Sequence, residues 1–202
     1  MGQIRVSNQS TPGRAGRFLV SDALTAIAAT VKKNGPKCGK VRLVLIDGPA
    51  GSGKSTFAQH LAHALGDCPV VSMDNLYNGW DAPLNGELYE RISLQLLEAW
   101  REESLARYHR FNWHQMKFDN WIDLPFCDTV IIEGVGAMHP ALSESACLTI
   151  WLEADEKFLL KRVLGRDGED IREQMVLWQK MEREYFKKYK VQAAADFAMK
   201  TS

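Results

Sequence analysis

Residues 48–55 read G-P-A-G-S-G-K-S and match every fixed position of the pattern G-x-x-x-x-G-K-[ST]. The apolar run 41–46 before this motif has the composition of a buried strand, and an amphipathic helical pattern follows it. Glycines allow backbone conformations that a Cβ forbids, so successive N–H groups of such a loop can point inward at phosphate oxygens. The order strand, loop, helix therefore predicts a phosphate-binding loop and argues against a glycine-rich turn without a function.

This loop predicts a site for a nucleoside triphosphate. Lys54 would reach the β- and γ-phosphates, Ser55 would offer its hydroxyl to Mg²⁺, and the positive end of the following helix dipole would face the triphosphate. We therefore expect ATP and Mg²⁺ as cofactors. The residues expected to bind ATP are Gly48, Pro49, Ala50, Gly51, Ser52, Gly53, Lys54, Ser55 and Thr56.

The chain has 202 residues, of which 46% are hydrophobic, enough for one sizeable core and too few for two full domains. Its 25 basic and 25 acidic residues balance, which favours a small-molecule partner over nucleic acid or an anionic membrane. Its cysteines are scattered and signal neither zinc nor disulfides. The apolar stretch 18–31 is too short to span a bilayer, and no signal-peptide pattern is present, so we expect a cytoplasmic protein. The oligomeric state stays open.

Hydrophobic periodicity and turn residues divide the chain into alternating strands and helices. Strands are predicted at 41–46, 68–73, 128–133, 147–152 and 195–199, and helices at 22–33, after the phosphate loop, at 87–103, at 155–164 and from there to about 190. This alternation predicts a parallel sheet with helices on both faces. Residues 1–17 are predicted to be a loosely packed lead-in, and residues 104–127 to be irregular. We divide the chain into the lead-in and its helix, 1–39, and one domain, 40–202.

Three further segments decide between the many proteins that use a phosphate loop. Residues 70–77 read V-V-S-M-D-N-L-Y, residues 80–83 read W-D-A-P, and residues 130–134 read V-I-I-E-G, whereas no N-K-x-D or L-S-G-G-Q sequence supports a GTPase or a transporter. With the loop, these segments resemble the uridine kinase family, whose relatives include phosphoribulokinase and pantothenate kinase. The resemblance covers residues 40–199. It implies a P-loop NTPase fold, an α/β fold with a parallel five-stranded sheet in the order 2-3-1-4-5.

The resemblance also assigns roles to single residues. It implies that Asp74 is the general base, that Asp81 holds a substrate hydroxyl beside Tyr77, and that Glu133 helps Ser55 to hold Mg²⁺. Physical chemistry supports this, because phosphoryl transfer to an alcohol needs a carboxylate near the acceptor hydroxyl. Glu133 follows four apolar residues. Burying a carboxylate there costs free energy unless a metal ion or a hydrogen-bond donor compensates its charge. Asp74 and Asp81 could instead be ordinary turn residues.

A lid over the phosphates is expected near residues 162–173. Arg162 and Arg166 correspond best to the arginine-rich lid of the family, and Arg172 corresponds less well because the run is thinner here. Guanidiniums can contact phosphate oxygens bidentately and neutralise charge in the transition state. We therefore assign Arg162 and Arg166 to catalysis and Arg172 to substrate binding, with a solvated surface charge as the alternative.

The chain departs from the family at the segment that recognises the pyrimidine. Uridine kinases carry Y-D-x-x-x-H there, whereas this chain has Phe111, Asn112 and Met116 at the corresponding positions. Phe111 and Asn112 are candidates for substrate binding. The altered segment leads us to expect weaker selectivity for a pyrimidine than in a typical uridine kinase.

These features together predict an ATP-dependent kinase that transfers the γ-phosphoryl group to a hydroxyl of a nucleoside-like metabolite. A nucleoside-monophosphate kinase is one alternative, although it needs further basic residues for the acceptor phosphate, and the pair Asp74 and Asp81 would repel such a substrate. A regulatory protein that binds ATP without phosphorylating anything is the other alternative.

Overall fold

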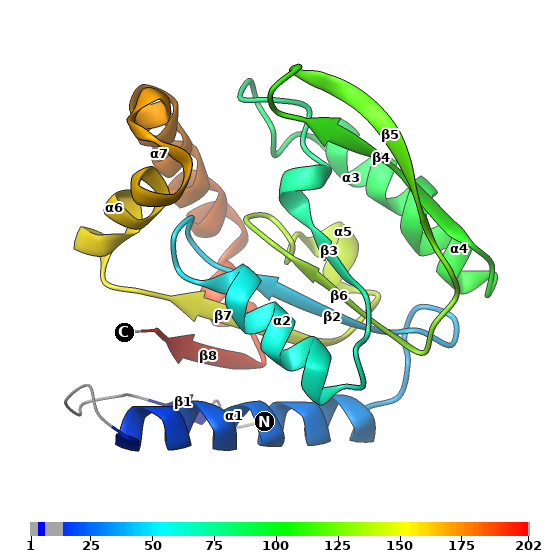
Figure 1. Ribbon diagram of the computed structural model, residues 1–202. Helices are drawn as coiled ribbons and strands as arrows, with labels where there is room; N and C mark the ends of the chain where they lie inside the picture. The colour runs from blue at the N-terminus through cyan, green and yellow to red at the C-terminus, as the bar shows by residue number, and fades with distance from the viewer. Residues whose placement is uncertain (1–3, 7–13, 202) are drawn as a thin grey trace.

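The computed structural model describes residues 4–6 and 14–201, and it is organised around one parallel sheet (Figure 1). The strands of this sheet are β1 (Ile4–Val6), β2 (Arg42–Asp47), β3 (Val70–Ser72), β6 (Thr129–Glu133), β7 (Ala146–Glu153) and β8 (Phe197–Lys200). They lie in the order β1-β8-β7-β2-β6-β3, and every pair is parallel. The five predicted strands thus have the expected order 2-3-1-4-5, and β1 adds a sixth strand beside β8.

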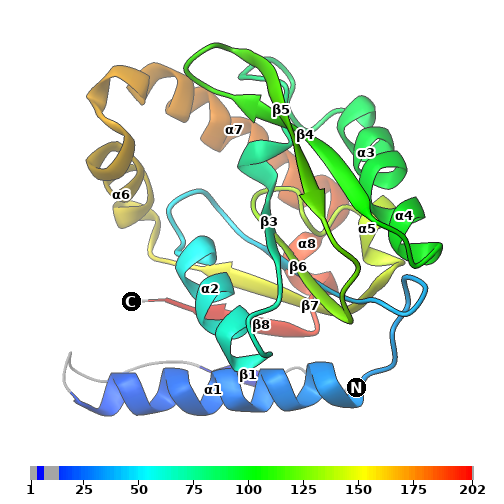
Figure 2. The same cartoon turned by 45° about the vertical axis from the view of Figure 1, so that its right-hand side comes forward.

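The two faces of the sheet are covered by different elements. Side chains of β2 alternate between the faces: Leu43 and Leu45 pack into one hydrophobic cluster, whereas Val44 and Ile46 pack into the other. The second cluster joins the sheet to α1 (Arg14–Lys33) and α2 (Lys54–Ala64), which lie on the same side of the sheet in both views (Figures 1 and 2). Because both faces are buried, the strands are continuous apolar runs.

The N-terminal helix begins earlier than the sequence predicts. α1 starts at Arg14, so Ser21 and Asp22 lie inside the helix, and Asp22 is exposed to solvent. The segment before Ser21 contains arginine, alanine and leucine, which favour a helix, and these residues extend it beyond the predicted cap. Of the predicted loosely packed lead-in, residues 4–6 belong to β1 and residues 14–17 to α1, and its remainder lies outside the described residues.

The predicted helix 87–103 is confirmed, with an irregular centre. α3 (Gly86–Ile92) continues through a π-helical turn, η2 (Ser93–Leu97), into α4 (Glu98–Arg101). Asn85 caps the N-terminus, because its Oδ1 accepts a hydrogen bond from the N–H of Leu88 at 3.0 Å. The apolar face of this helix packs against the first cluster of the sheet.

Residues 104–127 are not irregular. They contain an antiparallel hairpin of β4 (Ala106–Asn112) and β5 (Lys117–Leu124), which lies beside α3 and α4 in both views (Figures 1 and 2). Ala106, Tyr108 and Phe111 are the buried residues of β4, and the pairing register shifts between Arg110 and Phe111. This irregularity breaks the period of two by which a half-buried strand is recognised, so the pattern was missed.

The remaining elements connect the strands of the sheet. The short helix η1 (Met73–Asn75) follows β3, and α5 (Pro140–Ser143) precedes β7. After β7 come α6 (Glu156–Asp167), η3 (Glu169–Ile171), α7 (Arg172–Tyr189) and α8 (Val191–Ala194), where the sequence predicts two helices. None of the helices within residues 14–201 combines the length and the apolar composition needed to cross a lipid bilayer.

Candidate active site

The phosphate loop connects β2 to α2 and lines a cavity of about 720 Å³. A Cβ on Gly48 would lie 1.9 Å from the carbonyl oxygen of Leu152, and Gly53, which caps α2, has a φ of +90°, so both positions need glycine. Gly48, Pro49 and Ser52 support the loop and do not line the cavity. The loop residues that line it are Ala50, Gly51, Gly53, Lys54, Ser55 and Thr56.

A buried carboxylate anchors the start of the loop. Asp47 is fully buried and accepts hydrogen bonds from the backbone N–H groups of Gly48 at 2.7 Å, Met138 at 2.9 Å and Gly136 at 3.1 Å. Burial raises the pKa of Asp47 to about 6, although these hydrogen bonds oppose the shift. Asp47 therefore ties the end of β2 to the segment after β6. The sequence analysis missed it, although a charge at the end of an apolar run was a usable signal.

A second buried carboxylate reaches the loop from α7. Glu182 is 2% exposed, and its Oε2 accepts a hydrogen bond from the N–H of Ala50 at 3.0 Å. Desolvation raises the pKa of Glu182 to about 7, against the opposing effects of the Ala50 N–H and the Lys54 ammonium. Glu182 lies in a highly charged helical segment, and no sequence pattern separates it from its exposed neighbours.

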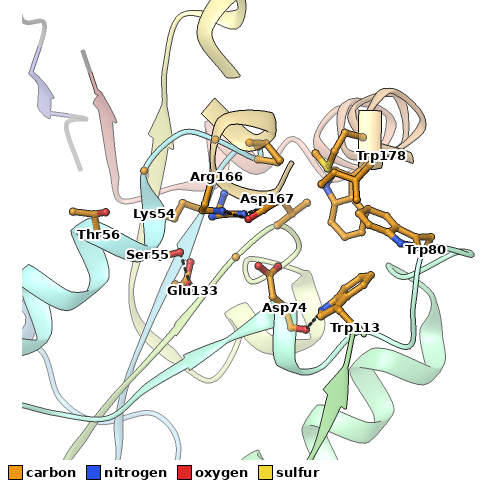
Figure 3. A pocket seen from close by; sticks show the side chains of 18 of the residues that line it. Lys54, Ser55, Thr56, Asp74, Trp80, Trp113, Glu133, Arg166, Asp167 and Trp178 are labelled. Atoms are coloured by element: carbon orange, nitrogen blue, oxygen red, sulfur yellow. Dashed lines mark hydrogen bonds and ion pairs between the residues drawn. The ribbon is translucent and has the colours of Figure 1, made fainter. Parts of the chain in front are cut away.

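Lys54 and Ser55 lie at the charged end of the cavity (Figure 3). The Lys54 ammonium folds back and donates hydrogen bonds to the carbonyl oxygens of Gly48 at 2.8 Å and Pro49 at 2.9 Å. The Ser55 hydroxyl donates to Oε1 of Glu133 at 3.1 Å, and Glu133 is only 3% exposed. Desolvation raises the pKa of Glu133 above its ordinary value, while Lys54 opposes the shift.

These two oxygen donors fit Mg²⁺. A hydroxyl and a carboxylate are hard ligands, and Mg²⁺ is usually held by one or two carboxylates together with phosphate oxygens and waters. Within the described part of the chain, no three residues of the types His, Cys, Asp and Glu gather as a metal site. Ser55 and Glu133 would therefore hold the ion jointly with the triphosphate and would not form a protein-only site.

Asp74 is held at the end of β3 by two hydrogen bonds. Its backbone N–H donates to the Ser72 hydroxyl at 3.3 Å, and its carbonyl oxygen accepts a bond from Trp113 Nε1 at 2.8 Å. The carboxyl faces the cavity between the charged residues and a group of tryptophans (Figure 3). Desolvation by the surrounding protein raises the pKa of Asp74, whereas Lys54 and Arg166 oppose the shift.

The three predicted lid arginines have different surroundings. Arg166 lies at the end of α6, lines the cavity and makes two hydrogen bonds of 2.7 Å to the carboxylate of Asp167. Arg162 donates to the carbonyl oxygen of Gly51 at 3.3 Å and touches the loop from outside the cavity. Arg172 is exposed and pairs with Glu169.

The five residues predicted to bind the substrate, Arg172 among them, do not line the cavity. Asp81 is exposed, and Tyr77 is fully buried with its hydroxyl donating to the carbonyl oxygen of Val135 at 2.6 Å. Phe111 is buried in the hairpin, and Asn112 donates to Asp119 at 2.7 Å. The side chains that do line this part of the cavity are Trp80, Trp113, His114, Ile171, Met175 and Trp178. Trp80 and Trp113 are sequence neighbours of the predicted residues Asp81 and Asn112, and this was the only sequence signal for them. Trp178 has no such neighbour.

The parallel sheet, the loop between β2 and α2, and the carboxylates at the strand ends define a P-loop NTPase fold. The family model described as AAA domain matches residues 44–187, more than half of the chain, so the chain belongs to this family. No curated protein matches the sequence.

Two solved structures have the same fold. A possible uridine kinase from Bacillus stearothermophilus is 18% identical with a TM-score of 0.64, covering 92% of this chain and 99% of that chain. A putative fructose transport system kinase from Silicibacter sp. TM1040 is 21% identical with a TM-score of 0.65, covering 87% of this chain and 98% of that chain. These likenesses confirm the expected resemblance to uridine kinase-like P-loop kinases at the level of the fold.

Proposed function

We propose that the protein is an ATP-dependent kinase that transfers the γ-phosphoryl group to a hydroxyl of a neutral, nucleoside-like small molecule. One observation carries the proposal: a carboxyl, that of Asp74, shares one cavity with Lys54 of the phosphate loop and with Arg166. A protein that only bound ATP would not need a carboxylate facing the phosphate end of the cavity.

Each residue has a defined task in this reaction. Asp74 accepts the proton of the acceptor hydroxyl as the hydroxyl oxygen bonds to the γ-phosphorus and the bond between that phosphorus and ADP breaks. Lys54 and Arg166 neutralise the negative charge on the transferring group. Bound Mg²⁺, held by Ser55 and Glu133, would supply further charge neutralisation at the phosphates.

The proposal includes a moving lid formed by the end of α6, η3 and the start of α7. Asp167 engages Nε and Nη2 of Arg166, so these two donors have to leave the pair before they can contact a phosphate. The exposed pair stabilises the protein weakly, because water competes for both partners. Closure over bound substrates would bring Arg166 to the phosphates and keep water from the γ-phosphorus.

The charges around the cavity argue against a nucleoside-monophosphate acceptor. Among the described residues that line the cavity, the cationic side chains are Lys54 and Arg166, and both lie at the phosphate end. An acceptor phosphate would meet Asp74 without a cation of its own, and like charges repel strongly in a partly enclosed site. This arrangement favours an uncharged acceptor.

A phosphoryl-transfer screen tests the proposal. The purified protein is incubated with Mg²⁺ and ATP labelled at the γ-phosphate, together with nucleosides, nucleoside monophosphates, sugars or vitamin alcohols. We expect label transfer to at least one neutral alcohol and loss of that transfer in Asp74→Asn. ATP binding without transfer to any acceptor would support the regulatory alternative, and a strong preference for monophosphates would overturn the neutral acceptor.

A further inference from the structure

The cavity has two chemically different ends. Every described charged side chain that lines it belongs to the phosphate end: Lys54, Asp74, Glu133, Arg166 and Asp167. The opposite end is formed by the indoles of Trp80, Trp113 and Trp178, which we call the indole wall, with His114, Ile171 and Met175 as further lining residues. Asp74 lies between the two ends (Figure 3).

The indole wall is built from three separate segments that brace one another. The ring centroids of Trp80 and Trp113 are 4.9 Å apart, and those of Trp80 and Trp178 are 5.9 Å apart at an interplanar angle of 90°. Behind them, the buried ring of Tyr77 packs against Trp113 at 6.4 Å and against Trp178 at 5.0 Å. Aromatic pairs in such tilted and edge-to-face arrangements are favourable, so the wall is formed before a ligand arrives.

The indole wall is also fixed relative to the proposed base. Trp113 Nε1 donates to the backbone oxygen of Asp74 at 2.8 Å, so a ring packed on the wall lies next to the Asp74 carboxyl. That bond occupies the indole N–H of Trp113, which is then not available to read the edge of a ligand. Recognition by the faces of aromatic rings tolerates different ligands, because every planar ring presents a π-face.

We propose that the acceptor is an uncharged alcohol carrying a planar ring, which packs on the indole wall while its hydroxyl reaches Asp74. This inference rests on the proposed kinase activity and narrows its substrate class. The ring is selected chiefly by its shape and apolar faces, and His114 is the polar neutral side chain of the lining that could contact its edge. Sugars and polyols without a ring system of this kind are then poor acceptors.

A matched series of acceptors tests this selection. The series consists of three ribosides that share the ribose hydroxyls. Uridine carries a base, 1-phenyl-ribofuranose carries an apolar ring without hydrogen-bonding edges, and methyl ribofuranoside carries no planar ring. We expect kcat/KM for the phenyl compound to lie within about tenfold of that for uridine, and kcat/KM for the methyl compound to be lower by roughly 10- to 100-fold, the usual worth of one stacked ring.

Substitutions in the indole wall test whether its tryptophans cause the preference for acceptors with a planar ring. Trp80→Ala is expected to raise KM for the two ring-bearing acceptors by roughly 10- to 100-fold, with KM for ATP unchanged, and Trp80→Phe is expected to restore most of the loss. The matched control is Trp121→Ala, because Trp121 is 49% exposed on β5 and does not line the cavity. Thermal melting of each variant checks that the fold is kept.

Binding is measured separately by tryptophan fluorescence, with the protein saturated by a non-hydrolysable ATP analogue and Mg²⁺. We expect the ring-bearing compounds to bind more tightly than the methyl compound, and Trp80→Ala to remove this difference. Equal binding of all three compounds, or a phenyl compound bound far more weakly than uridine, would overturn the indole wall as the selecting surface. Selective ring binding without phosphoryl transfer to any acceptor would instead overturn the kinase proposal alone.

Discussion

At the scale of single residues, the chemistry of the proposed site depends on the environment of Asp74. Its carboxyl lies in the cavity with Lys54 and Arg166, and the surrounding protein raises its pKa. A general base is most effective when its pKa is closer to the working pH than that of a free carboxyl, because proton transfer then has a larger driving force. The position of the Asp74 carboxyl in the cavity and the direction of its pKa shift are therefore both consistent with the proposed role of general base.

Asp74→Asn is expected to lower kcat by roughly 10²- to 10⁴-fold, the usual contribution of a positioned general base, with little change in KM for ATP. In the wild type, kcat/KM for the acceptor should rise with pH through a pKa above that of a free aspartate, because only the deprotonated carboxyl accepts a proton. The variant should lack this rise. Steady-state kinetics between pH 4 and 8 measure both effects, and a kcat within a few-fold of wild type would remove Asp74 from the mechanism.

At the scale of elements, α7 supports the phosphate loop through Glu182. The fold places this carboxyl on the Ala50 N–H and excludes water from it, so the protonated form is favoured in the folded protein. Lys54 and Asp47 are the charged groups that influence it, with opposite signs. Since its pKa rises from 4.5 to about 7 on folding, the unfolded chain loses the proton first as pH increases, and stability falls between these values.

Glu182→Gln tests this, because glutamine can still accept the Ala50 N–H bond and carries no charge. At pH 4 the two proteins should be similar in stability, and by pH 8 the variant should have the larger free energy of unfolding, by on the order of 1–3 kcal/mol. Urea unfolding across this range measures the difference. Glu184→Gln, a change of an exposed neighbour, is the control, and a pH-independent difference for Glu182→Gln would contradict the buried-charge explanation.

The proposed lid makes a prediction about the connection between α6 and α7. ATP and acceptor together should slow amide hydrogen exchange across residues 160–173 more than either ligand alone, because Arg166 contacts the phosphates only in the closed form. Exchange measured by mass spectrometry gives the comparison, with α1 as the internal reference because it packs on the opposite face of the sheet from the indole wall. If the rate of amide exchange across residues 160–173 is the same with and without both ligands, the proposal of a moving lid is contradicted.

The elements that sequence patterns predicted share one physical property. β2 and β7 are buried on both faces, and this produces the predominantly apolar runs by which they were recognised. The hairpin was not predicted, because the irregularity after Arg110 interrupts its alternation. The start of α1 was misplaced, because Ser21 and Asp22 look like a cap when read locally, whereas helix-favouring residues continue before them.

At the scale of the whole molecule, the sequence singled out residues that lie together at the charged end of the cavity, and it did not single out the indole wall. Glu133 ends β6, Asp74 comes shortly after β3, and Lys54 follows the loop after β2. Parallel strands bring their carboxyl ends together whatever else varies. The indole wall instead joins the loop after η1, the hairpin turn and α7. No local pattern records contacts between such distant segments, so Trp178 was not a candidate, and Tyr77 and Phe111 were assigned to substrate although the core buries them.

Ligand binding should be visible in the stability of the whole molecule. A ligand that binds only the folded state at 100 times its Kd stabilises it by about 2.7 kcal/mol, which raises the thermal midpoint of a chain of this size by roughly 5–10 °C. We expect this shift with Mg²⁺ and ATP and a smaller one with ATP and EDTA, since Ser55 and Glu133 would then hold no ion.

Lys54→Ala should abolish most of the shift, because the ammonium next to the loop is the main cation for the β- and γ-phosphates. Lys161→Ala, a change of an exposed lysine on α6, should keep the full shift and serves as the matched control. The Lys54 variant also loses two hydrogen bonds to loop carbonyls, so its midpoint without ligand is compared first. Scanning calorimetry measures each of these midpoints. A wild-type midpoint that does not change with Mg²⁺ and ATP would contradict nucleotide binding, on which the proposed kinase activity and the lid depend.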